Sequence, residues 1–325
     1  MKPSGYGVAV FAVCASAMHC PVVWAQAIYP NKPIRVIAPF APGGITTMLA
    51  QLVGQKLSEA WGQPVIVDNR PGGNTIIGTE LLARAQPDGY TLILTTTSHV
   101  IVPQLQKVPY DLARDFTPVG SISSNETLML THPGVSAKTL QELIALAKAQ
   151  PGKLNYASLG SGGIQHLSSE MFNLAAGIKV QPIPYKGAGP AIAALLGGQV
   201  HMSIQGTAPS LPQIRSGKLL GLAITGAKRW PQLPSVPTFI EAGVPDYDST
   251  YWQCILAPGG TPRAIVEKLS AEMARIISSP EVKEKLLAQG MDPWVSTPAQ
   301  LAAALDKERV KYGKIIKAAN VTSGS

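Results

Sequence analysis

Short apolar runs alternate along most of the chain with longer runs whose apolar positions recur every three or four residues. The short runs are typical of buried strands and the longer ones of amphipathic helices. Their alternation predicts parallel sheets covered by helices, an α/β protein. The predicted strands are 34–40, 65–69, 91–96, 127–131, 154–157, 180–185, 200–205 and 219–225. The predicted helices include 47–60, 76–85, 140–148, 167–176, 188–196 and 208–216.

The C-terminal part of the chain, from Pro262 onward, has an almost wholly helical pattern. Pro280 and Pro298 lie at or near further expected helix starts, where proline is favoured. Two Thr-x-x-Glu/Gln spacings, at 139–142 and 297–300, predict capping boxes at helix N-termini.

Two predicted strand-to-helix junctions are rich in glycine. Gly43 and Gly44 form the first, and 160–163, with the sequence Gly-Ser-Gly-Gly, forms the second. Glycine permits a sharp turn and a close approach to the backbone. The first N–H groups of a helix are unpaired and lie at the positive end of its dipole, so such a junction is suited to an anion. A plain strand-to-helix turn is the alternative on these residues alone.

A third strand end carries a cluster of hydroxyls, from Thr95 to Ser98. Ligands of open α/β sheets bind beyond the carboxyl ends of the strands. We therefore expect the three polar strand ends to converge on one anionic ligand.

The N-terminus has the features of a secretory signal. Lys2 precedes the apolar run 8–17, and small residues at Ala25 and Ala27 suit signal peptidase. We predict a signal peptide over 1–27, with cleavage after Ala25 as the other option. Because no later run is long and apolar enough to span a bilayer, the mature protein is expected to be soluble and outside the cytoplasm.

Charge and cysteine content narrow the choice further. The net charge is +8 for the chain and +7 without the segment that holds Lys2. Lysines and arginines are scattered, which disfavours nucleic-acid binding and suits a small anion. Two of the three cysteines lie in the predicted signal peptide, so Cys254 is left alone in an apolar strand pattern. It is expected to be a buried thiol, with no intrachain disulfide.

Motifs for catalysis and metal binding are incomplete. Ile45-Thr46 stand where a phosphate-binding P-loop needs Lys-Ser/Thr, and Leu159 stands where the serine-hydrolase elbow needs glycine. None of the four later histidines has a second ligand at a helical pairing distance. We predict no catalytic residue, metal or cofactor. His166, early in a helix, either caps and packs or lines a cleft.

Six separated segments carry a resemblance to a known family. They are "YPNKPIRVIAPFAPGG", "GQPVIVDNRPGGN", "PDGYTLILTT", "LNYASLGSGGIQHLSSEMF", "PYKGAGPAIAALLGGQV" and "LAPGGTP". In this order and spacing the chain resembles the receptors of the tripartite tricarboxylate transporters, the Bug family of extracytoplasmic solute receptors. The resemblance covers nearly the whole mature chain.

The resemblance implies a monomeric two-domain α/β periplasmic binding protein, type II-like, with the ligand cleft between the domains. Domain 1 would combine 28–126 with 248–325, and domain 2 would be 127–247. The loops 42–47 and 159–163 would hold a carboxylate for delivery to membrane permease subunits. A sensor partner of a membrane signalling protein and, less favoured, an enzyme on this fold are the alternatives. The candidate ligand-binding residues are Phe40, Gly43, Gly44, Thr46, Thr47, Thr97, Ser98, Ser161, Gly162, Gly163 and Gln205.

Two positions depart from the family pattern. The family usually has aspartate where Thr47 stands and often has it where Gln205 stands. Both changes replace an expected cleft anion by a neutral residue, and an ammonium group of a ligand would then lack its partner. We therefore predict a di- or tricarboxylate without an amine, aliphatic or aromatic.

Overall fold

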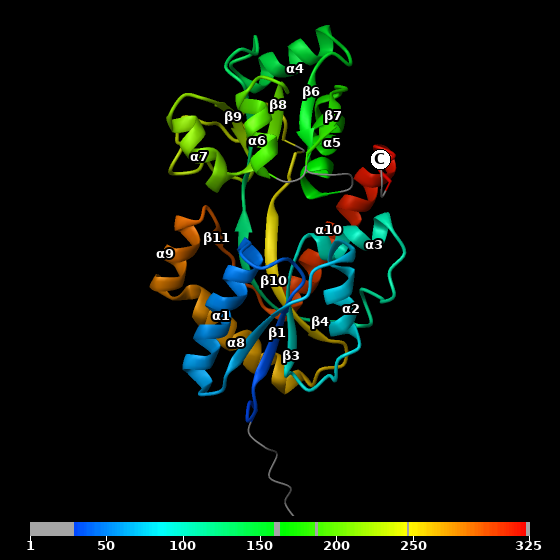
Figure 1. The fold of residues 1–325 in the computed structure, drawn as a ribbon, viewed down its shortest axis with the longest axis vertical. Coiled ribbons are helices and arrows are strands. Elements are labelled where there is room, and N and C mark those ends of the chain that lie inside the picture. Colours follow the sequence, from blue (N-terminus) through cyan, green and yellow to red (C-terminus); the bar gives the residue numbers. More distant parts are fainter. Residues whose placement is uncertain (1–28, 159–162, 186–187, 246, 323–325) are drawn as a thin grey trace, which may run out of the picture.

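The computed structural model describes residues 29–158, 163–185, 188–245 and 247–322. The predicted signal peptide lies outside these residues. Two lobes follow one another along the long axis of the molecule, each built on its own sheet (Figure 1). No helix among the residues just given is long and apolar enough to cross a membrane.

Lobe 1 is built on a six-stranded sheet, sheet A, in the order β11-β4-β10-β3-β1-β2. Its strands are β1 (Ile34–Ala38), β2 (Val65–Asn69), β3 (Thr91–Thr96), β4 (Phe116–Asn125), β10 (Tyr251–Pro258) and β11 (Asp292–Pro293). Its helical elements are α1 (Ile45–Trp61), η1 (Gly73–Thr75), α2 (Ile76–Ala83), α3 (Ser98–Leu105), α8 (Arg263–Ser278) and α9 (Pro280–Ala288).

Lobe 2 is built on a five-stranded sheet, sheet B, in the order β7-β6-β8-β5-β9. Its strands are β5 (Thr127–Thr131), β6 (Asn155–Ser158), β7 (Gln181–Pro184), β8 (Met202–Gly206) and β9 (Leu220–Ile224). Its helices are α4 (Leu140–Ala149), α5 (Ile164–Ala176), α6 (Ala188–Leu196) and α7 (Thr207–Arg215).

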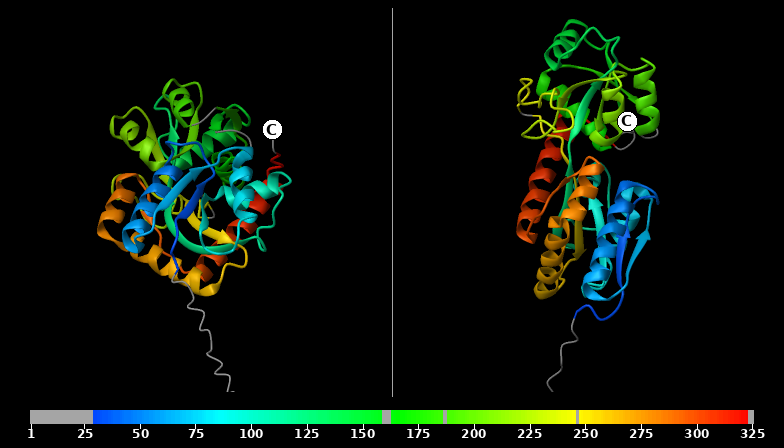
Figure 2. Two further views of the ribbon diagram at one scale, coloured as in Figure 1. Left: turned by 60° about the horizontal axis from the view of Figure 1, so that its bottom comes forward. Right: turned by 90° about the vertical axis from the view of Figure 1, so that its left-hand side faces the viewer.

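The last helix, α10 (Pro298–Ala318), connects the two lobes. It contacts α3 and β4 of lobe 1 and α5 of lobe 2. Figure 2 shows it running from the level of lobe 1 up to lobe 2. One buried apolar cluster also extends from lobe 1 through α10 into lobe 2. It includes Ile93 of β3, Tyr312 of α10 and Phe172 of α5.

The predicted α/β class is confirmed, but the sheets are mixed rather than parallel. Strand β10 runs antiparallel to β3 and β4, and β5 runs antiparallel to β8 and β9. Strands β5 and β10 each follow a segment that passes between the lobes. Each therefore begins at the interlobe end of its sheet, whereas the parallel strands end there. The domain boundaries near residues 126 and 247 remain a prediction.

Most predicted elements are present, two of them with a cap as expected. Thr297 and Gln300 form a full capping box on α10. Thr139 caps α4, but the Glu142 carboxylate accepts from the Lys138 N–H instead of completing the box. Cys254 is fully buried and free, and burial raises the pKa of its thiol.

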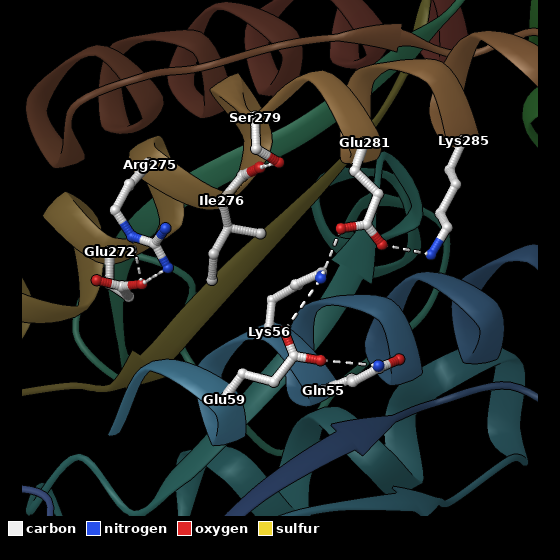
Figure 3. A network of polar contacts seen from close by, with 9 residues as sticks. All are labelled: Gln55, Lys56, Glu59, Glu272, Arg275, Ile276, Ser279, Glu281 and Lys285. Carbon is white, nitrogen blue, oxygen red and sulfur yellow. Dashed lines mark hydrogen bonds and ion pairs between the residues drawn. The ribbon is translucent and has the colours of Figure 1, made fainter. Parts of the chain in front are cut away.

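On the outside of lobe 1, α1 is linked to α9 by an exposed charge network (Figure 3). The Lys56 ammonium lies 3.0 Å from the Glu59 carboxylate and 2.7 Å from that of Glu281. Glu281 also accepts from Lys285 at 2.8 Å. Because both glutamates are about half exposed, solvent and salt screen these pairs and they contribute little to stability.

Candidate functional site

The carboxyl ends of the inner strands of the two sheets face each other between the lobes. Thr96, which ends β3, pairs with Gln253 near the interlobe end of β10, and β1 runs parallel to β3. In sheet B, Gly206 at the end of β8 pairs with Thr127, the first residue of β5. Since β6 is parallel to β8, the helices that follow these strands all begin at the interlobe faces. These helices are α1 and α3 of lobe 1 and α5 and α7 of lobe 2.

No acidic residue lies in the first turn of any of these four helices. Each helix N-terminus carries unpaired N–H groups and a partial positive charge. Four such ends with no neighbouring first-turn carboxylate give both interlobe faces a preference for anions.

The first glycine junction opens α1 without a side-chain cap at Gly44. Gly43 has a φ of +87°, a conformation that disfavours any other residue. The first intrahelical bond runs from the Met48 N–H to the Gly44 carbonyl at 3.1 Å, so three N–H groups at 45–47 have no helical acceptor. A Cβ atom added at Gly44 would meet only the Ala41 carbonyl oxygen, at 3.9 Å, and would otherwise project into open space.

Asn69, at the end of β2, bonds to the first junction, and the sequence analysis did not include it among the candidate residues. Its Nδ2 donates to the Phe40 carbonyl at 3.0 Å and to the Thr47 hydroxyl at 2.7 Å. The Thr47 hydroxyl in turn donates to the Ala41 carbonyl at 3.5 Å. The rule that polar residues at strand ends line the ligand edge would have found Asn69, had it been applied to β2 as it was to β3.

The hydroxyl cluster after β3 has partners within lobe 1. The Thr97 hydroxyl accepts from the Trp252 N–H at 3.3 Å, and the Thr96 hydroxyl accepts from the Ser98 N–H at 3.2 Å. Thr97 is buried, and Ser98 is half-buried. Thr97 thus ties the start of α3 to β10, the strand that enters from between the lobes.

The second glycine junction is described in part, because the predicted residues Ser161 and Gly162 lie outside the described ranges. Gly163 is the N-cap of α5, again without a side-chain cap. In the next turn, Ser168 donates to the Ile164 carbonyl at 2.7 Å and contacts the Ser249 hydroxyl. Ser249 belongs to the segment between β9 and β10, so α5 is anchored to the connection between the lobes.

His166 and Gln205 are both buried in lobe 2. His166 is 6% exposed, and burial lowers the pKa of its imidazole. Gln205 is 1% exposed, and its amide donates to the Ser203 hydroxyl at 2.7 Å. Because side chains alternate along β8, Ser203 and Gln205 lie on the same face of sheet B. Leu128 of β5, which pairs with Gln205, lies on this face and packs in the part of the core beside α6.

Two cavities lie near the site, and among the described residues none of the predicted ligand-binding ones lines either cavity. One, of about 740 Å³, lies between α5, β7 and residues 318–321 after α10. The other, of about 370 Å³, lies between the lobes and is lined by Glu126, Asp292 and 226–231. Burial raises the pKa of Glu126 and Asp292. Within the described ranges, no group of three or more His, Cys, Asp or Glu side chains is placed to hold a metal ion.

Comparisons with known proteins show which family the chain resembles and which solved structures share its fold. The model of the tripartite tricarboxylate transporter family receptor matches residues 49–321. Protein BugT of Bordetella pertussis is 36% identical over 292 residues, which cover 89% of this chain and 90% of that protein. A solved structure of Rpa4515 from R. palustris with adipate has a TM-score of 0.77 and 34% identity, covering 90% of this chain and 99% of that one. MatC from Rhodopseudomonas palustris with bound malate has a TM-score of 0.73 and 30% identity, covering 89% and 100%.

Proposed function

Because the chain belongs to the tripartite tricarboxylate transporter receptor family, we propose that it captures a small carboxylate without an amine in the periplasm and delivers it to membrane permease subunits. Membership of the family confirms the resemblance seen in six sequence segments. The family description is that of a receptor, and two similar structures are named with a bound ligand. Both facts support binding and transport rather than catalysis.

The absence of first-turn acids from the four helices that follow β1, β3, β6 and β8 is the observation that carries this proposal. A carboxylate needs donors and positive potential, which helix N-termini supply through their N–H groups. An ammonium group needs an acceptor, and leaving it unpaired in a closed site is costly. Thr47 is neutral and already bonded to Asn69, so it offers the ammonium group no charged acceptor.

The proposed ligand class is a di- or tricarboxylate without an amine. Adipate and malate, the ligands named for the two similar structures, both belong to this class. Two carboxylates would suit two facing sets of helix N-termini, one on each lobe. Closure by hinge motion would then bring the lobes together around the ligand.

Calorimetric titration of the mature protein with adipate, malate, citrate, phthalate, aspartate and glutamate tests the proposal. We expect at least one amine-free ligand to bind roughly tenfold or more tighter than either amino acid, about 1.4 kcal/mol. Thr47→Asp should narrow this gap, because a carboxylate there repels the dianion and accepts from the ammonium. Gln51→Glu adds the same charge on the exposed side of α1 and should leave the gap unchanged. Tighter binding of aspartate by the wild type would contradict the proposed ligand class.

Expression of the full chain in a Gram-negative host tests the proposed location. We expect a soluble form in the periplasmic fraction, beginning at Ile28 or Gln26 by N-terminal sequencing. An uncleaved form in the membrane fraction would refute the signal-peptide hypothesis. Uptake of the bound carboxylate by cells with and without the permease subunits would then test the role in transport.

A further inference from the structure

We propose that Asn69 is a positioning residue that holds the β1–α1 junction in the arrangement that binds the ligand. This inference rests on the proposed carboxylate-binding function. It concerns a residue that bonds to the junction rather than one that lies within it.

Asn69 closes the junction from one side with a single amide group. Its two Nδ2 hydrogens go to the Phe40 carbonyl and the Thr47 hydroxyl, which bracket the loop 41–46. No side-chain donor is left on Asn69 for a ligand carboxylate. Its effect on binding must therefore pass through the loop and not through direct contact.

The backbone around Asn69 is firmly held. Asn69 is in register with Ala38 of β1, and the next N–H, that of Arg70, donates to the Ala38 carbonyl at 2.9 Å. Behind it, α2 packs closely against the end of β1, since a Cβ at Gly78 would lie 2.7 Å from the Cβ of Pro39 and 3.0 Å from the Arg70 carbonyl oxygen. A side chain on so fixed a strand end holds its partners in a defined place.

The loop it holds has little packing of its own. Residues 41–45 are all exposed, and Gly43 and Gly44 give the backbone many alternative conformations. Ordering a free residue costs conformational entropy, and a loop that is ordered beforehand avoids this cost on binding. The amide of Asn69 supplies that order, so its loss should weaken binding even though no ligand contact is removed.

The chemistry of the pair requires a donor at position 69. The Phe40 carbonyl can only accept, and the Thr47 hydroxyl already uses its own hydrogen toward Ala41. An ionised aspartate at 69 would offer acceptors only and would place a negative charge beside the junction. A protonated aspartate would again donate one hydrogen.

Calorimetric titration tests this inference. The ligand is adipate or the tightest amine-free ligand of the panel above. The proteins are wild type, Asn69→Ala, Asn69→Asp, Thr47→Val and Asn69→Ala/Thr47→Val. We expect about tenfold weaker binding for Asn69→Ala and about a hundredfold for Asn69→Asp at pH 8. The losses of the two single variants should not add in the double variant, because both changes break the bond between Asn69 and Thr47. The deficit of Asn69→Asp relative to wild type should shrink about tenfold between pH 8 and pH 5, as ligand binding raises the pKa of the new carboxyl and protonates it.

Asn31→Asp is the matched control. Asn31 is an exposed asparagine on the amino-end side of sheet A, bonded to the Tyr90 hydroxyl at 2.8 Å. The Asn31→Asp variant introduces the same charge away from the junction. It should bind the ligand like wild type, with no change in the pH dependence of binding. Folded Asn69→Ala and Asn69→Asp proteins with wild-type affinity, or a double variant whose losses simply add, would overturn the inference while leaving the proposed function intact. A wild type that binds no carboxylate of the panel would overturn both.

Discussion

The two glycine junctions have the same local pattern but are held in different ways. Each follows a buried strand, begins a helix at a glycine without a side-chain cap and has no acid in the first helical turn. The junction of lobe 1 is tied to a neighbouring strand of its own sheet through Asn69. Helix α5, which follows the junction of lobe 2, is tied through Ser168 to Ser249, in the segment between the lobes.

This difference separates two parts of receptor function. A junction bonded within its own sheet keeps its shape when the lobes move. A helix bonded to the interlobe segment would move with that segment in a hinge motion. We infer that lobe 1 supplies a fixed binding surface and that lobe 2 couples ligand contact to closure.

Of the variants on the lobe 1 side of this comparison, Gly44→Val should have the largest effect on ligand affinity. Its side chain would project from the junction into the space where a ligand approaches, while meeting only the Ala41 carbonyl oxygen at 3.9 Å. The extended backbone of Gly44, with φ −85° and ψ 172°, suits a β-branched residue. We expect at least roughly hundredfold weaker binding, about 2.7 kcal/mol, with a cooperative thermal transition near that of wild type. A folded variant with unchanged affinity would place the ligand away from this junction.

A buried histidine in each lobe should make stability fall in acid. His99, in the first turn of α3, is fully buried against Phe116, and burial lowers its pKa to about 4. The unfolded chain, with a histidine pKa near 6.5, therefore binds the proton more readily, so stability is complete above pH 6.5 and falls as the pH drops toward 4. The loss should reach roughly 3 kcal/mol by pH 4.

Denaturant unfolding at several pH values between 4 and 8 measures this effect against a His99→Leu variant. The difference between the two curves isolates His99, because the buried acids whose pKa is raised act equally in both proteins. His166 of lobe 2, whose pKa burial also lowers, should leave a residual slope in the variant. Parallel curves for wild type and His99→Leu would show that His99 is not the group that titrates.

Ser168→Ala should have a moderate effect on the lobe 2 side. It removes a buried hydroxyl that bonds to Ile164 and to Ser249, and it should cost about 1–2 kcal/mol of stability. Ser169→Ala is the matched control, because Ser169 is equally buried and its hydroxyl donates to the Gln165 carbonyl of its own helix. We expect Ser168→Ala alone to change carboxylate affinity in calorimetric titration. Equal effects of the two variants on affinity would remove the proposed coupling between α5 and the interlobe segment.

Glu281→Gln should have the smallest effect. It breaks the exposed link between α1 and α9 on the outside of lobe 1 (Figure 3). Because these charges are solvated, both the midpoint of thermal unfolding and the carboxylate affinity should stay within measurement error. A clear loss of affinity would mean that the far end of α1 controls its N-terminal junction, and lobe 1 would then not be the rigid partner.

Local sequence was sufficient where one periodicity dominates a segment. Strands β2, β3 and β5 and helix α6 lie at their predicted residues, because each is a continuous apolar run or a regular amphipathic one. Strand β4 was missed because Pro118, Gly120 and several serines interrupt its pattern. Helix α3 was missed because its first residues were interpreted only as a hydroxyl cluster and Pro103 lies within it.

The candidate site likewise has features that the local sequence predicts and features that it does not. The backbone geometry of the first junction follows from Gly43 and Gly44, since only glycine readily adopts a φ of +87°. The roles of the neutral side chains did not follow. Thr47 is engaged by Asn69 of β2, and Gln205 is buried in sheet B, where it pairs with Leu128 of β5, so both depend on segments distant in the chain.

The sequence by itself determined the fold class, the family and the glycine junctions, because periodicity, glycine content and motif order are properties of neighbouring residues. Only the tertiary structure decided which strands run antiparallel, which side chains support each junction and where α10 crosses. Those features depend on which distant segments pack together, since burial and hydrogen bonding are satisfied by the whole chain and not by any one segment.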